Sequence, residues 1–255
     1  MNIQKIFALV KVHLKKLIRE PATLFLMVLF PVMLTVFFGL GFASIDSGIP
    51  GVSQFEVMVP GLYAFVCIFI IMTVAMSFSE DREKGLLRRL NTTPLTSGEF
   101  IGSHLVTSTL ISVLQVVIVV VLSLPFMNIE TTRSFVLGGG LGMAFIFMIF
   151  LSICSVGLGL ITATIAKSPG AATGISFIFI MPQMFLGTYI VPSTSVTQVI
   201  SMFLPSAYVT DGITMLFNGV PLTNPIIWIK LATVVLISVV IVIVGILLFK
   251  KYGNK

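Results

Sequence analysis

Six long runs of mostly apolar residues constrain what this chain can fold into more than any other feature. An α-helix needs about 20 apolar residues to cross the hydrocarbon core of a bilayer, where its backbone hydrogen bonds must be satisfied within the segment. Only 9% of the 255 residues are charged, whereas soluble domains have about a quarter. We therefore predict an all-α polytopic membrane protein with a six-span transmembrane domain at residues 21–255. Its spans lie at about 21–43, 57–79, 105–127, 135–165, 170–191 and 226–249.

Lys and Arg residues are distributed unevenly between the segments that connect these runs. If the chain starts in the cytosol, 13 of the 15 basic residues lie on the inner side, and only Arg133 and Lys230 lie outside. Cytosolic segments of membrane proteins carry such an excess of positive charge. The sequence thus predicts a multi-pass protein of the cell (plasma) membrane with both termini in the cytoplasm. The stem of Lys230 is expected to extend towards the lipid headgroups.

The segment 192–222, between the fifth and sixth runs, is a candidate for a seventh span. Pro205 divides it into two apolar halves that are each too short to cross a bilayer, and Asp211 would lie deep in lipid. A seventh span would also place the basic C-terminal tail outside. We expect two short re-entrant helices in the outer leaflet instead.

Residues 1–20 have the pattern of an amphipathic helix. Apolar side chains recur at helical spacing from Ile3 to Leu17. Such a helix lies on the inner membrane surface and is attracted to anionic lipid. A cleavable signal is less favoured, because the long apolar run starts only after five basic residues. These five are Lys5, Lys11, Lys15, Lys16 and Arg19.

A dense cluster of charge stands between the second and third runs. Residues 79–99 hold 8 of the 24 charged residues (15 basic and 9 acidic), with four of each sign. We predict a short helix over 80–90 with a leucine ridge, ended at Thr93 and Pro94. A solvated surface helix is the simple alternative. However, attraction to lipid alone favours excess positive charge, whereas balanced charge around leucines suits docking to a protein surface.

The sequence offers little for chemistry within the chain. No charged residue or histidine lies near the middle of a run, and no nucleotide-binding motif is present. The glycines at 138–142, 157–159 and 170–174 are interpreted as sites of close helix packing. Cys67 and Cys154 lie in apolar runs, and His13 and His104 are 91 residues apart without companion ligands at metal-site spacing. We expect no catalytic residues, metal, cofactor or nucleic-acid partner, and any driving energy would come from another chain.

The stretch EDREKGLLRRLNTTPLTSGEFIGSH at 80–104 resembles the cytoplasmic signature of the ABC-type-2 exporter permeases, particularly the daunorubicin/doxorubicin-resistance permease group. Two positions depart from the pattern. Leu86 stands where threonine is frequent, which could alter docking, and His104 stands where lysine is frequent, which we expect to be neutral. Residues 1–20 resemble the connecting helix of the family, and FLPSAYVTDGI, with Pro205, Tyr208 and Asp211, resembles its outer re-entrant element. The matching signature residues are Glu83, Gly85, Leu86, Arg88, Arg89, Leu90, Thr93 and Pro94.

The resemblance implies a half-transporter without covalent chemistry of its own. Two permease copies, forming a homodimer, would pair around a central pathway, and two ABC ATPase subunits carrying Mg-ATP would dock on the coupling segment 80–95. The implied function is outward transport of a hydrophobic or amphiphilic substrate, such as a drug or lipid. The family's pathway borders the first, second and fifth spans. Its candidate lining residues, for which lipid-facing packing is the alternative, are Phe37, Phe38, Phe65, Phe69, Phe177 and Phe185.

Other functions stay open from the residues alone. Oligosaccharide, ion or haem export is compatible with the pattern, and so is a purely structural assembly factor. An ion-coupled secondary transporter or channel that works without an ATPase is the main alternative, although the missing charges at membrane depth count against it.

Overall fold

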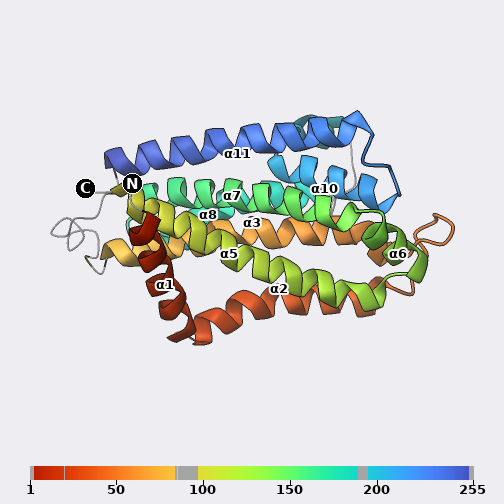
Figure 1. Ribbon diagram of the computed structural model, residues 1–255, viewed down its shortest axis with the longest axis horizontal. Helices are drawn as coiled ribbons and strands as arrows, with labels where there is room; N and C mark the ends of the chain where they lie inside the picture. The colour runs from red at the N-terminus through yellow and green to blue at the C-terminus, as the bar shows by residue number, and fades with distance from the viewer. Residues whose placement is uncertain (1–2, 20, 84, 86–96, 189–194, 253–255) are drawn as a thin grey trace.

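A computed structural model describes residues 3–19, 21–83, 85, 97–188 and 195–252 of the protein. Figure 1 shows long helices running side by side, and within the described residues the only β-bridge joins Asp46 to Ser53. The helices in chain order are α1 (Ile3–Arg19), α2 (Pro21–Phe42), α3 (Gln54–Glu83), α5 (Ser97–Ser123), the 3₁₀ turn η1 (Leu124–Phe126), α6 (Ile129–Leu137), α7 (Gly140–Ile165), α8 (Pro169–Gly187), α9 (Ser195–Ser201), α10 (Pro205–Phe217) and α11 (Pro225–Tyr252).

Five helices are long and apolar enough to cross a membrane: α3, α5 with η1, α7, α8 and α11. This finding confirms an all-α polytopic membrane protein. The predicted runs at 57–79, 105–127, 170–191 and 226–249 correspond to α3, α5 with η1, α8 and α11. The first run corresponds to α2, which has 22 residues and includes the apolar segment Val28–Phe42. A sixth span through α2 therefore stays a prediction.

The fourth apolar run contains a break. The sequence predicted one span at about 135–165; α7 supplies this span from Gly140, but the prediction of one continuous run was wrong at its start, because α6 ends at Leu137. The physical reason is Gly139, whose φ of +76° lies in the left-handed region that favours glycine. The neighbouring Gly140 is tightly packed, since a Cβ added there would lie 3.1 Å from the ring of Phe135. The predicted run is longer than α7 because it includes the end of α6.

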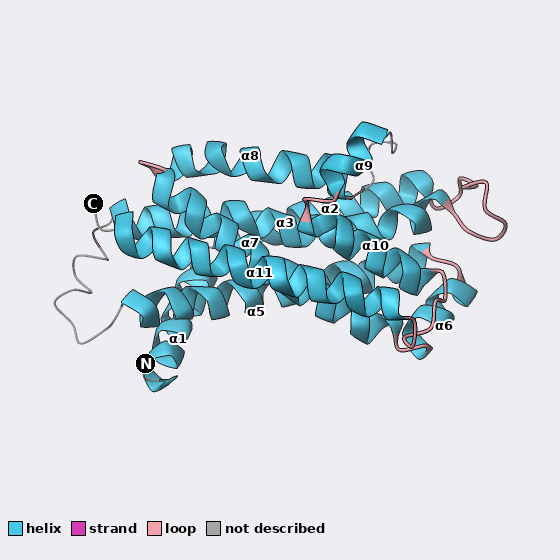
Figure 2. Cartoon of the chain, turned by 90° about the horizontal axis from the view of Figure 1, so that it is seen from above, coloured by secondary structure: helices cyan, strands magenta, loops and turns pink. Residues whose placement is uncertain are grey.

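The core of the bundle lies along α3 and α7, which pack against each other. Helix α7 also packs along α11, and α3 along α8 (Figures 1 and 2). Two glycines allow these close approaches: a Cβ at Gly159 would lie 2.9 Å from the carbonyl oxygen of Ile71, and one at Gly157 would meet the backbone of α11 at 3.0 Å. The close-packing interpretation is thus confirmed for this pair. It stays a prediction for Gly170 and Gly174, where an added Cβ would have no atom of the described residues within 4 Å.

A substitution at Gly157 tests this packing. Gly157→Val should lower the stability of the purified protein by about 1–3 kcal/mol, because extra side-chain volume forces α7 and α11 apart. Thermal unfolding in detergent measures the effect. Gly142→Val on the same helix is the matched control, since its Cβ position is open. Equal destabilisation by both variants would show that helix propensity, rather than the close approach of α7 and α11, determines the loss.

A capping box fixes the start of α3. Ser53 Oγ accepts a hydrogen bond from the Glu56 backbone N–H at 3.3 Å, and Glu56 Oε2 accepts from the Ser53 backbone N–H at 2.7 Å. The same carboxylate also accepts from the backbone N–H of Asn128, just after η1, at 2.9 Å. Glu56 is only 3% exposed, so its charge is compensated by these donors. The first turn of α3 is thereby tied to the chain that follows α5.

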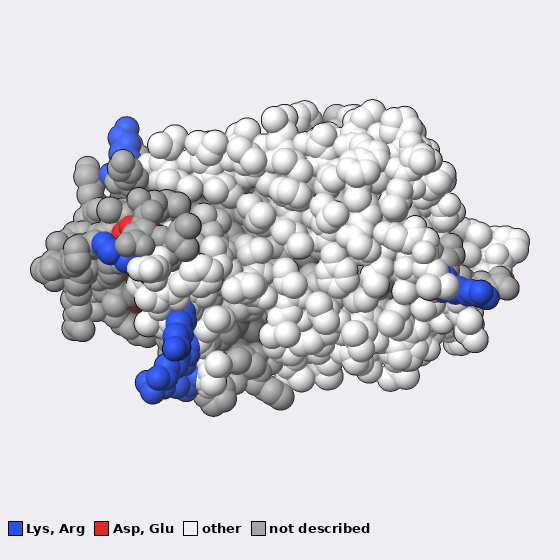
Figure 3. All heavy atoms as spheres, viewed as in Figure 1, with Lys and Arg blue, Asp and Glu red and all other residues white. Residues whose placement is uncertain are grey.

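Charged side chains gather at the two ends of the bundle. On the face drawn in Figure 3, Lys and Arg lie at both ends, Asp or Glu is visible at the left end, and the middle is uncharged. We name the end that contains α1 and Glu83 the inner end and the end that contains α6 the outer end, following the predicted orientation. An uncharged belt between two charged ends is typical of a membrane-spanning protein.

Candidate functional site

At the inner end, α3 continues beyond the predicted second span. The sequence predicted a short separate helix over 80–90, but residues 80–83 form the last turn of α3. Gly85 then adopts φ of +68°, and its N–H donates to the carbonyl oxygen of Arg82 at 3.0 Å. A left-handed glycine after the last turn is a common helix stop. The predicted helix over 80–90 was therefore wrong in this part, because no helix-breaking residue separates Ser79 from Glu83.

Most of the predicted docking residues lie outside the described part of the chain. Glu83 is exposed and Gly85 is half-buried, and α5 begins at Ser97, after the segment. The docking role of this segment stays a prediction. The signature residues outside the described ranges are Leu86, Arg88, Arg89, Leu90, Thr93 and Pro94.

Arg82 connects the end of α3 to the turn between α7 and α8. Its guanidinium donates to the carbonyl oxygen of Ala166, the residue that caps α7. Ala166 is buried and packs with Ala75 of α3 and Ala172 of α8. Since a basic side chain satisfies the free carbonyls at a helix C-terminus well, this bond anchors α3 to α7 at the point where α3 leads towards the charged segment.

Asp81 and His104 form a buried polar contact between α3 and α5. His104 Nε2 lies 3.1 Å from Asp81 Oδ2, and the two residues are 3% and 4% exposed. The imidazole packs against the ring of Phe78, with centroids 4.0 Å apart, and its centroid lies 3.9 Å from that of His13 on α1. Three helices that are distant in sequence therefore meet at this cluster.

Helix α1 runs crosswise to the long helices at the inner end (Figure 1). It packs mainly against α5, with Val10 5% exposed at the contact. Phe7 on the same helix is 68% exposed, which leaves an apolar side chain available to lipid. The structure confirms a helix over Ile3–Arg19, and its amphipathic placement on the membrane surface stays a prediction. Of the predicted basic residues, Lys11, Lys15 and Arg19 are exposed, whereas the side chain of Lys16 lies outside the described set.

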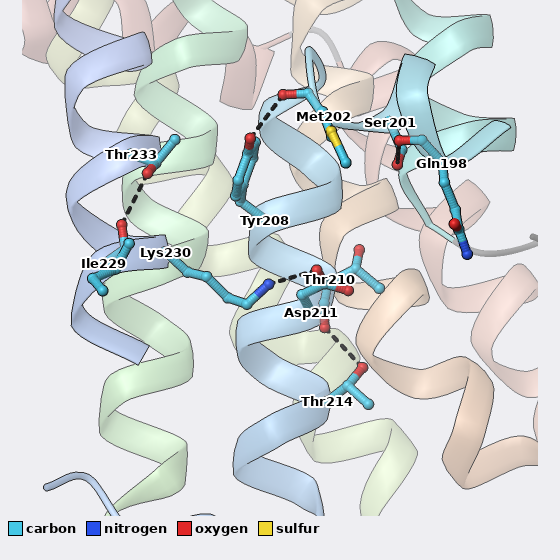
Figure 4. Close-up of polar contacts among 10 residues, drawn as sticks. All are labelled: Gln198, Ser201, Met202, Tyr208, Thr210, Asp211, Thr214, Ile229, Lys230 and Thr233. Carbon is cyan, nitrogen blue, oxygen red and sulfur yellow. Dashed lines mark hydrogen bonds and ion pairs between the residues drawn. The ribbon is translucent and has the colours of Figure 1, made fainter. Parts of the chain in front are cut away.

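At the outer end, the predicted segment 192–222 contains two short helices. Pro205 occupies the first position of α10, and the Tyr208 hydroxyl donates to the Met202 carbonyl at 2.8 Å (Figure 4). Asp211 Oδ2 accepts from Lys230 Nζ of α11 at 2.6 Å. Lys230 thus binds a carboxylate, where the sequence had suggested only extension towards headgroups. With 7 and 13 residues, α9 and α10 are too short to cross a bilayer.

Residues 4–218 match one protein-family model, described as ABC-2 type transporter. The chain belongs to this family. The match covers α1 to α10, and so includes both the inner-end contacts and the outer pair of short helices. It confirms the family that the signature at 80–104 indicated.

Curated relatives of this ABC-2 chain are named as permeases. The "Probable multidrug ABC transporter permease YbhR" of Escherichia coli (strain K12) is 26% identical over 136 residues, 53% of this chain and 35% of that protein. The chain thus spans about a third of the length of this relative. Proteins named as transport permease ycf38 are 26% identical in Porphyra purpurea (85% of this chain, 75% of that protein) and 25% identical in Cyanophora paradoxa (98% and 89%).

The predicted aromatic lining residues of the ABC-2 chain lie on α2, α3 and α8, and their role in a pathway stays a prediction. Phe65 and Phe69 on α3 lie 4.9 Å apart between ring centroids, and Phe69 lies 4.7 Å from Phe30 of α2. Phe37 is 69% exposed and Phe65 is buried. The remaining predicted residues have other positions: Phe38 packs against Phe42 on α2, whereas Phe177 and Phe185 lie on α8.

Sequence reasoning missed three residues that organise the inner end: Asp81, Arg82 and His104. Asp81 and Arg82 belong to the charged segment 79–99 and His104 follows it closely, but nothing in the spacing says which partner each meets. Their position in the sequence was the one indication of such contacts, since all three fall near the predicted inner ends of the second and third spans. A charged or polar residue just inside a span commonly bonds to a neighbouring helix end.

Proposed function

We propose that this chain is the membrane-spanning subunit of an ATP-driven exporter. Membership of the ABC-2 transporter family, matched over residues 4–218, carries the proposal. ATP hydrolysis takes place on a separate ATPase subunit that binds Mg-ATP, and this chain contributes no catalytic residues. The names of its relatives, which are permeases, agree with this division of labour.

The proposed assembly contains two copies of this chain and two ATPase subunits in the plasma membrane. Helix α2 supplies the sixth span, both termini are cytoplasmic, and α9 and α10 enter the outer leaflet without crossing. The charge distribution supports this orientation, since 13 of the 15 basic residues then lie inside. Placing α9 and α10 outside also keeps Asp211 near the headgroups, where its bond to Lys230 is less costly than in hydrocarbon.

Coupling runs from the charged segment into the bundle. The ATPase subunits bind the segment 80–95, and their closure moves the end of α3. Arg82 connects that end to α7, and Asp81 connects it to α5, so the movement is shared among three helices. Helix α1 moves together with α5 because the two helices pack against each other. The transport pathway then opens to the outside.

The proposed substrate is hydrophobic or amphiphilic. Aromatic contacts between α2 and α3, centred on Phe69 near the middle of α3, supply apolar side chains for such a substrate. The name of the Escherichia coli relative refers to multiple drugs, which agrees with a permissive apolar site. A panel of candidate substrates has to include oligosaccharides, ions and haem, so that their export can be distinguished from export of a hydrophobic or amphiphilic substrate.

Reconstitution tests the proposal. The purified chain is placed in liposomes with and without its co-purifying ATPase, and efflux of a fluorescent amphiphile or a fluorescent lipid analogue is followed. Transport should require the ATPase, Mg²⁺ and hydrolysable ATP, and a non-hydrolysable analogue should abolish it. Transport by the chain alone, driven by a proton or sodium gradient, would replace this proposal with an ion-coupled transporter or channel.

A further inference from the structure

Three side chains capable of binding a metal meet at the inner end. They are His13 on α1, Asp81 on α3 and His104 on α5, and the ligand atoms that they offer all lie within 4.8 Å of one another. Asp81 and His104 are almost fully buried, and His13 is half-buried with its Nε2 atom shielded from solvent. The sequence had indicated no metal because 91 residues separate the histidines, but the packing of α1 on α5 brings them together.

The ligand set selects a class of ion. Two imidazole nitrogens and one carboxylate oxygen are the ligands of zinc-type sites that keep a fourth position open, whereas Mg²⁺ and Ca²⁺ prefer oxygen ligands throughout. We propose that His13, Asp81 and His104 bind one divalent transition ion of the zinc type. This inference concerns binding by the chain itself and does not depend on the proposed transport function.

The three side chains need only a small rearrangement to bind one ion. Ligand atoms about 2.0–2.1 Å from a tetrahedral ion are about 3.3 Å apart, and His104 Nε2 already lies 3.1 Å from Asp81 Oδ2. The ring of His13, with its centroid 3.9 Å from that of His104, has to turn towards them. Helix α1 lies at the edge of the bundle (Figure 1), and His13 is half-buried there. Phe78 and Phe100 pack around His104 and keep the site largely dry.

Binding would fix α1 to the two helices that flank the charged segment. In the described structure α1 contacts α5 through apolar residues such as Val10, and a metal bond adds a direct connection from His13 to the last turn of α3. Metal binding would therefore restrain α1 relative to α3 and α5. We expect Zn²⁺ to raise the melting temperature of the purified chain through this connection.

Calorimetry with Zn²⁺ tests the site directly. The full chain is purified in detergent with an affinity tag that contains no histidine, treated with chelator, and titrated with Zn²⁺. We expect one ion per chain and no binding of Mg²⁺. His13→Ala and His104→Ala should each lower the affinity for Zn²⁺ by more than the ~10-fold to 100-fold typical of losing a residue that only supports a ligand. Asp46→Asn, at an exposed carboxylate, is the control and should bind like the unaltered chain.

Absorption of Co²⁺ gives a second readout. A tetrahedral site of nitrogen and oxygen ligands should give d–d bands without a thiolate charge-transfer band, because Cys67 and Cys154 are buried elsewhere in the bundle. His13→Ala should fold best among the ligand variants, since His13 is the most exposed of the three. Absence of Zn²⁺ binding, equal binding by His13→Ala, or a thiolate band with Co²⁺ would each overturn the proposal.

Discussion

Replacing Glu83, Arg88 and Arg89 together by alanine is expected to lower co-purification of the ATPase subunit by about tenfold or more. A tenfold loss corresponds to about 1.4 kcal/mol, which is less than several charged interface contacts can supply. Glu83 is exposed at the end of α3, immediately before the left-handed Gly85, so it is available to a partner. Pull-down through a tagged permease measures the loss, and ATP-dependent efflux from liposomes should fall in parallel.

The control for this variant changes charge at the opposite end of the bundle. Asp46→Ala with Arg133→Ala alters two exposed charges at the outer end and should leave ATPase binding unchanged. Both variants should insert into the membrane equally, since neither changes an apolar run. Wild-type yield of the ATPase with the triple variant, together with unchanged efflux, would refute docking at residues 80–95.

Removal of the Asp211 carboxylate should destabilise the outer end by about 1–3 kcal/mol, because Lys230 then loses its charged partner in a partly buried place. Asp211→Ala makes this change. Exchange of the two charges, Asp211→Lys with Lys230→Asp, should recover much of the loss. Thermal unfolding followed through Trp228 measures both effects, since this single tryptophan lies two residues from Lys230.

Thr233→Val is the matched control on α11. The Thr233 hydroxyl donates to the Ile229 carbonyl of its own helix, so its removal should not separate α10 from α11. If Asp211→Ala costs no more stability than this control, or if the charge exchange recovers nothing, then the ion pair between α10 and α11 does not hold the outer helices together.

The sequence predicted the helices well because their starts are marked. Pro21, Pro169, Pro205 and Pro225 each occupy the first position of a helix, where the missing N–H costs nothing. Apolar runs long enough to cross a bilayer predicted the extent of the long helices. The break at Gly139 was missed because three consecutive glycines inside an apolar run read equally well as a close helix contact. Only the backbone conformation distinguishes the two.

The candidate site was less predictable for a different reason. His13 and His104 become neighbours only through the packing of α1 on α5, and the sequence gives no distance between helices that are not consecutive. The bond of Lys230 to Asp211 was missed in the same way, since both residues had separate explanations in the sequence. Local sequence patterns specify the helices, whereas contacts between helices depend on how the helices pack in the folded bundle.

Helix α3 is the most enclosed of the candidate membrane spans and also the longest, with 30 residues. At a rise of about 1.5 Å per residue it measures about 45 Å, enough to reach from one water layer to the other. Its interior proline, Pro60, lies within the first two turns, close to the end fastened by Glu56. The remaining stretch is an unbroken stiff rod. Under the proposed coupling, a displacement applied at the Glu83 end of α3 would be carried along the helix as far as Pro60 without an intervening proline.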